Sequence, residues 1–114
     1  MKKDEFYLNH IIDSMEHIES FISGGKDEFF KSRLIQDAVI RNLEIIGEAV
    51  KKLSMDLRMQ YNHIPWREMA GLRDVLIHEY FGVDLKIVWG VVEKELPRLK
   101  PMIQQILIES ENME

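Results

Sequence analysis

Apolar residues recur at spacings of three and four along almost the whole chain, and this periodicity limits the possible folds more than any other feature. In the first segment it links Leu8, Ile11, Ile12, Met15 and Ile18. This spacing places apolar side chains on one face of an α-helix, whereas a half-buried strand alternates apolar and polar residues. No segment shows a convincing alternation of that kind. The sequence therefore predicts an all-α fold.

Glycine, proline and capping residues divide the chain into about five helices, which predicts a helical bundle. The first two helices are long enough to pack antiparallel, with the others closing the core. An interior glycine, Gly47, favours a close approach between helices. The expected helices cover, approximately, residues 4–22, 27–53, 54–61, 65–81 and 84–108.

Several residues mark the expected helix ends. Asp27 and Asp84 suit N-caps, and Gly82 suits a left-handed terminator. Pro65 suits the first turn of a helix. Pro97, followed by a second proline, predicts a bend or break near residue 96, because proline lacks a backbone N–H and clashes with the preceding turn.

The chain has 114 residues, which fits a single domain over residues 1–114, and we expect a frayed tail at 107–114. It has no cysteine, no signal-peptide pattern and no apolar run long enough to cross a membrane, so we expect a cytoplasmic protein. The net charge of −5 argues against general binding of nucleic acid. An RNA-active protein of this charge would need a second subunit or a partner to concentrate its Arg and Lys residues.

The stretch "GLRDVLIHEYFGVD", residues 71–84, places polar side chains on an otherwise apolar helix. At about 100° per residue, Tyr80 falls almost over Arg73, and His78 falls on a second line with Asp74. The two lines lie side by side. The opposite arc of the helix carries apolar residues and is the expected core face: Leu72, Val75 and Leu76.

Two interpretations of these polar residues remain open at this point. Arg, His and Tyr together suit a phosphate site, because a guanidinium donates a bidentate fork and a histidine exchanges protons near neutral pH. RNA carries its own nucleophile, the 2′-hydroxyl. Alternatively, Asp74 and His78 form a surface pair, Arg73 extends past apolar neighbours, and Tyr80 packs half-buried.

Metal and cofactor sites are not expected. His10 and His17 lie seven residues apart, His63 precedes a turn, and no pair has an H-x-x-x-H spacing. The glycines of "SGGKD" lack the strand and helix context of a phosphate-binding loop.

The opening stretch resembles the signature of the HEPN superfamily, in its HepT-like branch. The family pattern R-x-x-x-x-H-x-Y matches Arg73, His78 and Tyr80. The upstream segments "RNLEIIGEAVKKLS" and "IPWREMAGLRD" resemble the family in the same order. The resemblance thus covers nearly the whole chain.

This resemblance implies a small helical bundle that forms a two-fold homodimer, or a larger assembly, with the signature residues lining a cleft at the interface. It implies a metal-independent endoribonuclease toxin of a type VII-like toxin–antitoxin pair, acting on tRNA or mRNA, with Arg73 and His78 as catalysts. It also implies a nucleotidyltransferase antitoxin that attaches AMP to Tyr80. Asp74 would orient His78.

Further residues match the family less specifically. Asn42 and Glu44 match polar positions of the second-helix segment, and we expect supporting roles for both.

The sequence shows no basic stripe outside the expected cleft, which predicts modest RNA affinity or recognition of RNA shape. Two other functions use the same residues. The chain could be a non-catalytic, nucleotide-binding or docking partner of a nucleotidyltransferase. It could also be a helical dimer whose polar cluster only stabilises the fold.

Overall fold

The computed structural model describes residues 2–77 and 84–112, with the backbone alone for residues 73–77. All regular structure in this part of the chain is helical, which confirms the predicted all-α class. The elements are α1 (Lys2–Phe21), α2 (Lys26–Lys31), α3 (Arg33–Lys51), α4 (Met55–Gln60), α5 (Trp66–Ile77), α6 (Leu85–Gly90), η1 (Val91–Glu95) and α7 (Leu96–Asn112).

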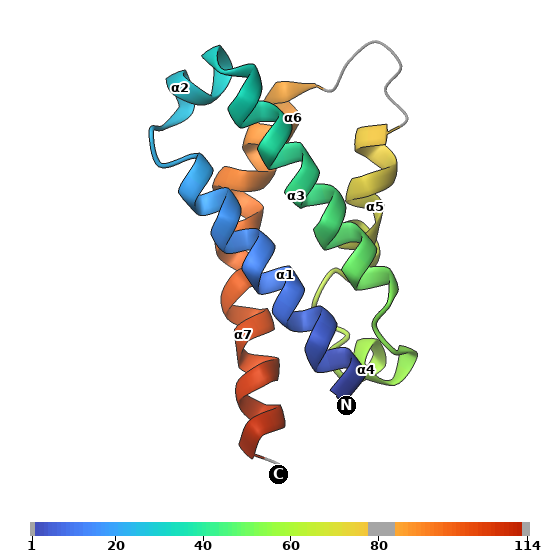
Figure 1. Cartoon of the computed structure of the whole chain (residues 1–114). Coiled ribbons are helices and arrows are strands. Elements are labelled where there is room, and N and C mark those ends of the chain that lie inside the picture. The colour runs from blue at the N-terminus through green and yellow to red at the C-terminus, as the bar shows by residue number, and fades with distance from the viewer. Residues whose placement is uncertain (1, 78–83, 113–114) are drawn as a thin grey trace.

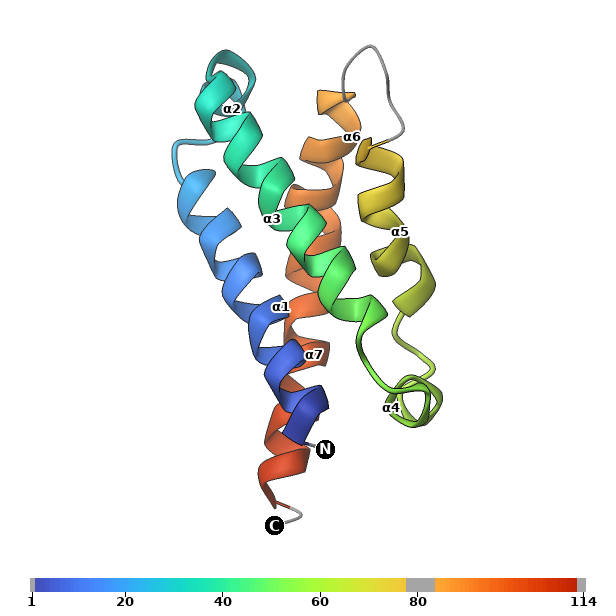
Figure 2. The same cartoon turned by 45° about the vertical axis from the view of Figure 1, so that its right-hand side comes forward.

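The long elements run up, down, up and down through an elongated bundle (Figures 1 and 2). In chain order the four columns are α1, α3, α5 and the continuous stack of α6, η1 and α7. The short helix α2 joins α1 to α3 at one end of the bundle, and α4 joins α3 to α5 at the other. None of the helices in the described part has both the length and the apolar character needed to cross a bilayer.

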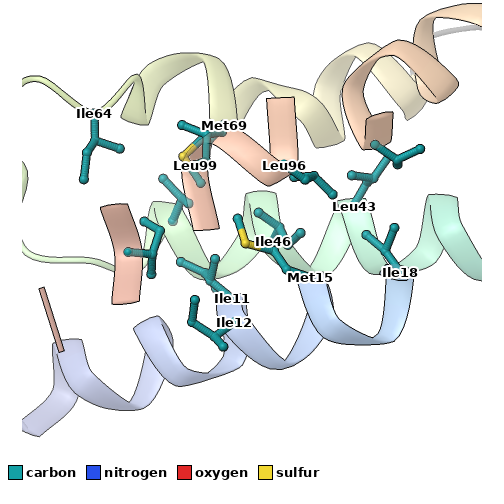
Figure 3. Packing of buried hydrophobic residues seen from close by; sticks show 14 of the residues in the cluster. Ile11, Ile12, Met15, Ile18, Leu43, Ile46, Ile64, Met69, Leu96 and Leu99 are labelled. Atoms are coloured by element: carbon teal, nitrogen blue, oxygen red, sulfur yellow. The ribbon is translucent and has the colours of Figure 1, made fainter. Parts of the chain in front are cut away.

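The antiparallel pair of long helices predicted from the sequence is α1 against α3, and their contact forms a large part of the core (Figure 3). Ile11 and Met15 of α1 and Ile46 of α3 are fully buried. Each such side chain contributes about 1.5–3 kcal/mol of hydrophobic stabilisation. The apolar periodicity of these two segments therefore corresponds directly to the buried faces.

The single helix expected over 27–53 is divided, because the chain turns at Ser32. The backbone of Ser32 is extended, and its hydroxyl accepts a hydrogen bond from Ile35 N at 3.2 Å, so it caps α3. The expected N-cap at Asp27 is wrong. Helix α2 begins one residue earlier, after Gly25, whose φ of 91° favours glycine.

A buried carboxylate fixes the entrance to α4. Asp4 is 7% exposed and accepts hydrogen bonds from Ser54 N at 2.8 Å and from Ser54 Oγ at 2.7 Å. Ser54 in turn caps α4 by accepting from Leu57 N at 3.2 Å. The first turn of α1 is thereby joined to the connection between α3 and α4.

The last column has the predicted irregularity, but it takes the form of a π-helical turn. Asp84 caps α6 as expected, accepting from Lys86 N at 2.9 Å. The wider turn η1 ends at Glu95, two residues before Pro97. In a regular α-helix the ring of Pro97 would crowd the preceding turn, and the wider turn makes room for it. Pro101 lies inside α7.

The tail is more ordered than expected, since α7 continues to Asn112. Ser110 is buried and its hydroxyl donates a hydrogen bond to Glu5 of α1. Further up the helix, Lys100 Nζ donates to Glu19 Oε1 at 2.9 Å. These contacts with α1 hold the C-terminal helix in place where a frayed end was predicted.

Candidate active site

The helix that carries the polar motif, α5, is anchored at its start. Pro65 was expected in the first turn but directly precedes the helix, and its carbonyl accepts a backbone hydrogen bond from Met69 N at 3.1 Å. Trp66 is buried and donates its indole N–H to Tyr61 O at 3.0 Å. Met69 is 2% exposed, and α5 packs along α3 (Figure 2). The first half of α5 is therefore held firmly on the bundle.

The backbone of Arg73 and Asp74 lies in α5, on two different faces of the helix. Position 73 comes seven residues after Trp66 and four after Met69, so it falls on the line of the helix that is buried in the preceding turns. Position 74 comes seven residues after Arg67, on a neighbouring line. Both positions thus lie on one helix. The predicted core face was the opposite arc, with Leu72, but the buried line is that of Trp66 and Met69, and Leu72 is only partly buried. His78, Tyr80 and Gly82 lie outside the described residues.

Asn42 lies in the interior between α3 and α1. It is 8% exposed, and its side-chain amide donates to Ala38 O at 2.8 Å. Its Oδ1 lies 3.4 Å from Nδ1 of His17, on α1. The described contacts of Asn42 thus join two scaffold helices.

Glu44 lies two residues further along α3, and residues two apart on a helix do not face each other. It forms an ion pair of 3.7 Å with Arg41 on the same helix, and 26% of its side chain is exposed. In the described contacts, therefore, Asn42 and Glu44 do not contact each other.

The three remaining histidines lie apart. His10 is exposed on α1 beside Phe6, His17 contacts Asn42, and His63 is exposed after α4. In the part of the chain that the structure describes, no three His, Asp or Glu residues are grouped so that they could hold a metal ion.

A concave, basic surface flanks the start of α5, and the sequence analysis missed it. This basic groove has a volume of about 490 Å³ and lies where the end of α3, α4 and α5 meet. Its cations form a local cluster in the folded chain and not a basic stripe in the sequence. The cations come from three different helices and lie seven and nine residues apart, so no periodicity in the sequence indicated them. The described lining residues of the basic groove are Lys51, Met55, Arg58, Trp66, Arg67, Ala70 and Gly71.

A second groove, of about 350 Å³, lies on the other side of α5. It is bounded by Met69 and Leu72 of α5 and by η1 and α7. Its described polar groups include Arg98 and Glu95, which pair with each other at 2.8 Å. Helix α5 is thus flanked by one mainly apolar groove and one basic groove.

The fold and the motif together define a class of protein. The chain is an all-α bundle in which the R-x-x-x-x-H-x-Y segment begins on α5, and a small helical bundle carrying this motif is what the resemblance to HEPN domains implied. Comparison with known families identifies the family more closely than the fold and the motif do. The model of the family described as Ribonuclease HepT-like matches residues 11–106, so the chain belongs to the HepT-like ribonuclease family.

Individual relatives agree with this assignment. A protein of Thermococcus cleftensis named "Probable ribonuclease HepT" is 44% identical over 101 residues, covering 88% of this chain and 92% of that protein. A "Putative RNase" of Caldanaerobacter subterraneus subsp. tengcongensis is 43% identical over 108 residues, covering 94% of this chain and 96% of the relative.

A longer relative also matches. A protein of Methanocaldococcus jannaschii named "Gamma-glutamylcyclotransferase and putative RNase" is 54% identical over 111 residues, covering 96% of this chain. The chain spans only 50% of the length of that relative. No solved structure gives a significant match.

Proposed function

We propose that the chain is an endoribonuclease that cleaves RNA with Arg73 and His78. The observation that carries this proposal is the family match over residues 11–106, which contains the complete R-x-x-x-x-H-x-Y segment. The position of Arg73 on α5, a helix anchored at its start, supports it, because a catalytic group is best placed on a regular element of the fold.

The proposed chemistry needs only the RNA and these side chains. The 2′-hydroxyl oxygen attacks the neighbouring phosphorus, and the bond from phosphorus to the 5′-oxygen breaks, which leaves a 2′,3′-cyclic phosphate and a 5′-hydroxyl. One imidazole takes the proton from the 2′-hydroxyl, and a second donates a proton to the leaving 5′-oxygen. Arg73 stabilises the charge that grows on the phosphate oxygens. No metal ion is needed to create the nucleophile.

Two imidazoles require two chains, since the motif supplies one histidine per chain. We therefore infer a two-fold homodimer in which both copies of the motif share a cleft. Such pairing also brings two copies of Arg73 together on a protein of net charge −5. Asp74 orients His78 in this proposal. Asn42 and Glu44 act further away, Asn42 by holding α3 against His17 of α1.

The decisive experiment is RNA cleavage in EDTA by purified His78→Ala. We expect cleavage to fall by about 10²–10⁴-fold, the usual contribution of general acid–base catalysis. His10→Ala is the matched control, because His10 is exposed and outside the motif, and it should cleave normally. Equal cleavage by folded His78→Ala refutes the catalytic assignment. No cleavage by the parent protein, with nucleotide binding that Arg73→Ala abolishes, favours the non-catalytic partner instead.

We further propose that the protein is the toxin of a toxin–antitoxin pair, neutralised when a nucleotidyltransferase attaches AMP to Tyr80. An AMP group there adds bulk and negative charge where the RNA phosphate must bind. After incubation with the cognate enzyme and ATP, intact mass should rise by whole AMP units and cleavage should stop. Tyr80→Phe should gain no mass, while Tyr61→Phe, at a tyrosine hydrogen-bonded to Glu109, should be modified like the parent. Modification of Tyr80→Phe contradicts the assignment.

A further inference from the structure

The basic groove beside α5 has the charge of a polyanion-binding site on an otherwise acidic protein. Three of its described lining residues are cations, Lys51, Arg58 and Arg67, and none is a carboxylate. The whole chain, in contrast, carries 20 acidic and 15 basic residues. Such a local excess of one charge attracts oppositely charged ligands even when the net charge opposes them.

The two arginines of the groove differ from the other arginines that the structure describes with their side chains. Arg33, Arg41 and Arg98 each form an ion pair with a carboxylate three or four residues away in the sequence. Among residues 2–77 and 84–112, Arg58 and Arg67 form no such pair.

Arg58 is the more informative of the two. Its Nε is buried and has no hydrogen-bond partner in the described part of the chain. A buried donor without an acceptor destabilises the fold. The guanidinium of Arg58 therefore lines the groove without an acceptor for Nε among the described residues.

One face of α5 leads from the groove to position 74, the residue proposed to orient His78. Arg67, Gly71 and Asp74 follow one another at spacings of four and three, so they share that face. Between Arg67 and Asp74 the face carries only the small residues Ala70 and Gly71, both partly exposed. Seven residues of helix span about 10 Å. A chain of phosphates lying in the groove would therefore lie close to position 74.

We propose that the basic groove binds the phosphodiester backbone of a single RNA strand next to the bond that is cut. The proposal rests on the proposed function for the identity of the substrate. Arg58 and Arg67 hold successive phosphates, since a guanidinium fork matches phosphate oxygens in geometry and charge. Backbone contacts of this kind position RNA without reading its sequence.

The test measures binding without cleavage. A fluorescein-labelled, fully 2′-O-methylated RNA lacks the nucleophile, so its anisotropy reports affinity alone. The double variant Arg58→Gln/Arg67→Gln should bind at least ten times more weakly than the parent. Each lost phosphate contact should also lower the salt slope, log Kobs against log salt, by about 0.7, hence about 1.4 for two. Arg33→Gln/Arg98→Gln removes the same charge outside the groove and should keep the parent slope.

Each other outcome overturns the proposal. Equal weakening by the two double variants means that only net charge matters. Failure of the parent to bind, or displacement of the RNA by an oligoglutamate of equal charge at equal concentration, means that the groove does not select phosphates.

If Arg58→Gln fails to fold, Arg67→Gln alone should lower the slope by about 0.7, and Arg58→Lys should retain binding. Loss of binding by the groove variant in a protein that cleaves no RNA would sustain this inference while the proposed function fails.

Discussion

Buried polar side chains in this bundle join helices to one another. Asp4 accepts two hydrogen bonds from Ser54, and Asn42 contacts His17 across the α1–α3 interface. In a low-dielectric interior each such group must keep its partner, because an unpaired one is costly. These residues therefore define which helix turns lie opposite each other.

Asp4 illustrates how much stability is lost when a buried polar side chain is removed from its partner. Asp4→Ala leaves the N–H and hydroxyl of Ser54 without their acceptor and loosens the cap of α4. We expect the free energy of unfolding to fall by about 1.5–3 kcal/mol, the range for hydrogen bonds to a charged group. Urea unfolding followed by circular dichroism measures it. Asp13→Ala, at an exposed position of α1, is the control and should change the midpoint little; equal losses would show that the bond to Ser54 adds nothing.

At the scale of the helices, the connection after α4 is joined to the C-terminal helix. The hydroxyl of Tyr61 donates to Glu109 Oε2 at 2.6 Å. This hydrogen bond raises the pKa of Tyr61 above its ordinary value and, together with a weaker one from Gln105, lowers the pKa of Glu109. The bond thus joins α7 to the segment that leads into α5.

The two pKa shifts give the bond a defined pH range. The raised pKa of Tyr61 means that its contribution is present below the ordinary value of 10.0 and is lost as pH rises through the higher folded value. The lowered pKa of Glu109 means that its contribution is present above 4.5 and is lost as pH falls through the lower folded value. Tyr61→Phe should therefore lower the urea midpoint most between these limits, and the difference should shrink at either extreme. A difference independent of pH contradicts this account.

Helix type and most helix ends followed from local sequence signals. Apolar periodicity predicted the α1–α3 core, and Asp84 was identified as a cap from its position alone. The break at Ser32 was not predicted, because the apolar pattern continues through it and the turn depends on packing of α2 against α3. The length of α7 was underestimated for a similar reason, since Ser110 is held by Glu5, 105 residues away in the sequence.

The candidate site was predictable only in part. Arg73 and Asp74 were correctly expected on one helix, because helical periodicity is a local property of the sequence. The cations Arg58 and Arg67 were not identified, because they come from α4 and α5 and meet only in the folded chain.

At the scale of the whole molecule, the proposed activity belongs to a pair of chains. Co-refolded mixtures of parent and His78→Ala chains test this. If each cleft needs two intact histidines, an equal mixture should show about a quarter of the parent activity, because only that fraction of random dimers is fully intact. Activity of one half would mean that each chain works alone. Mixing with His10→Ala, which should be fully active, controls for losses during refolding.

Both chain ends lie at one end of the elongated bundle, whereas α5 finishes and α6 begins at the opposite end (Figures 1 and 2). Anything attached to either terminus, such as a purification tag, a fluorophore or a second folded unit, thus starts far from the last turn of α5. The basic groove, in contrast, includes α4, which lies at the same end of the bundle as the termini, so a bulky attachment there would start near the proposed RNA path.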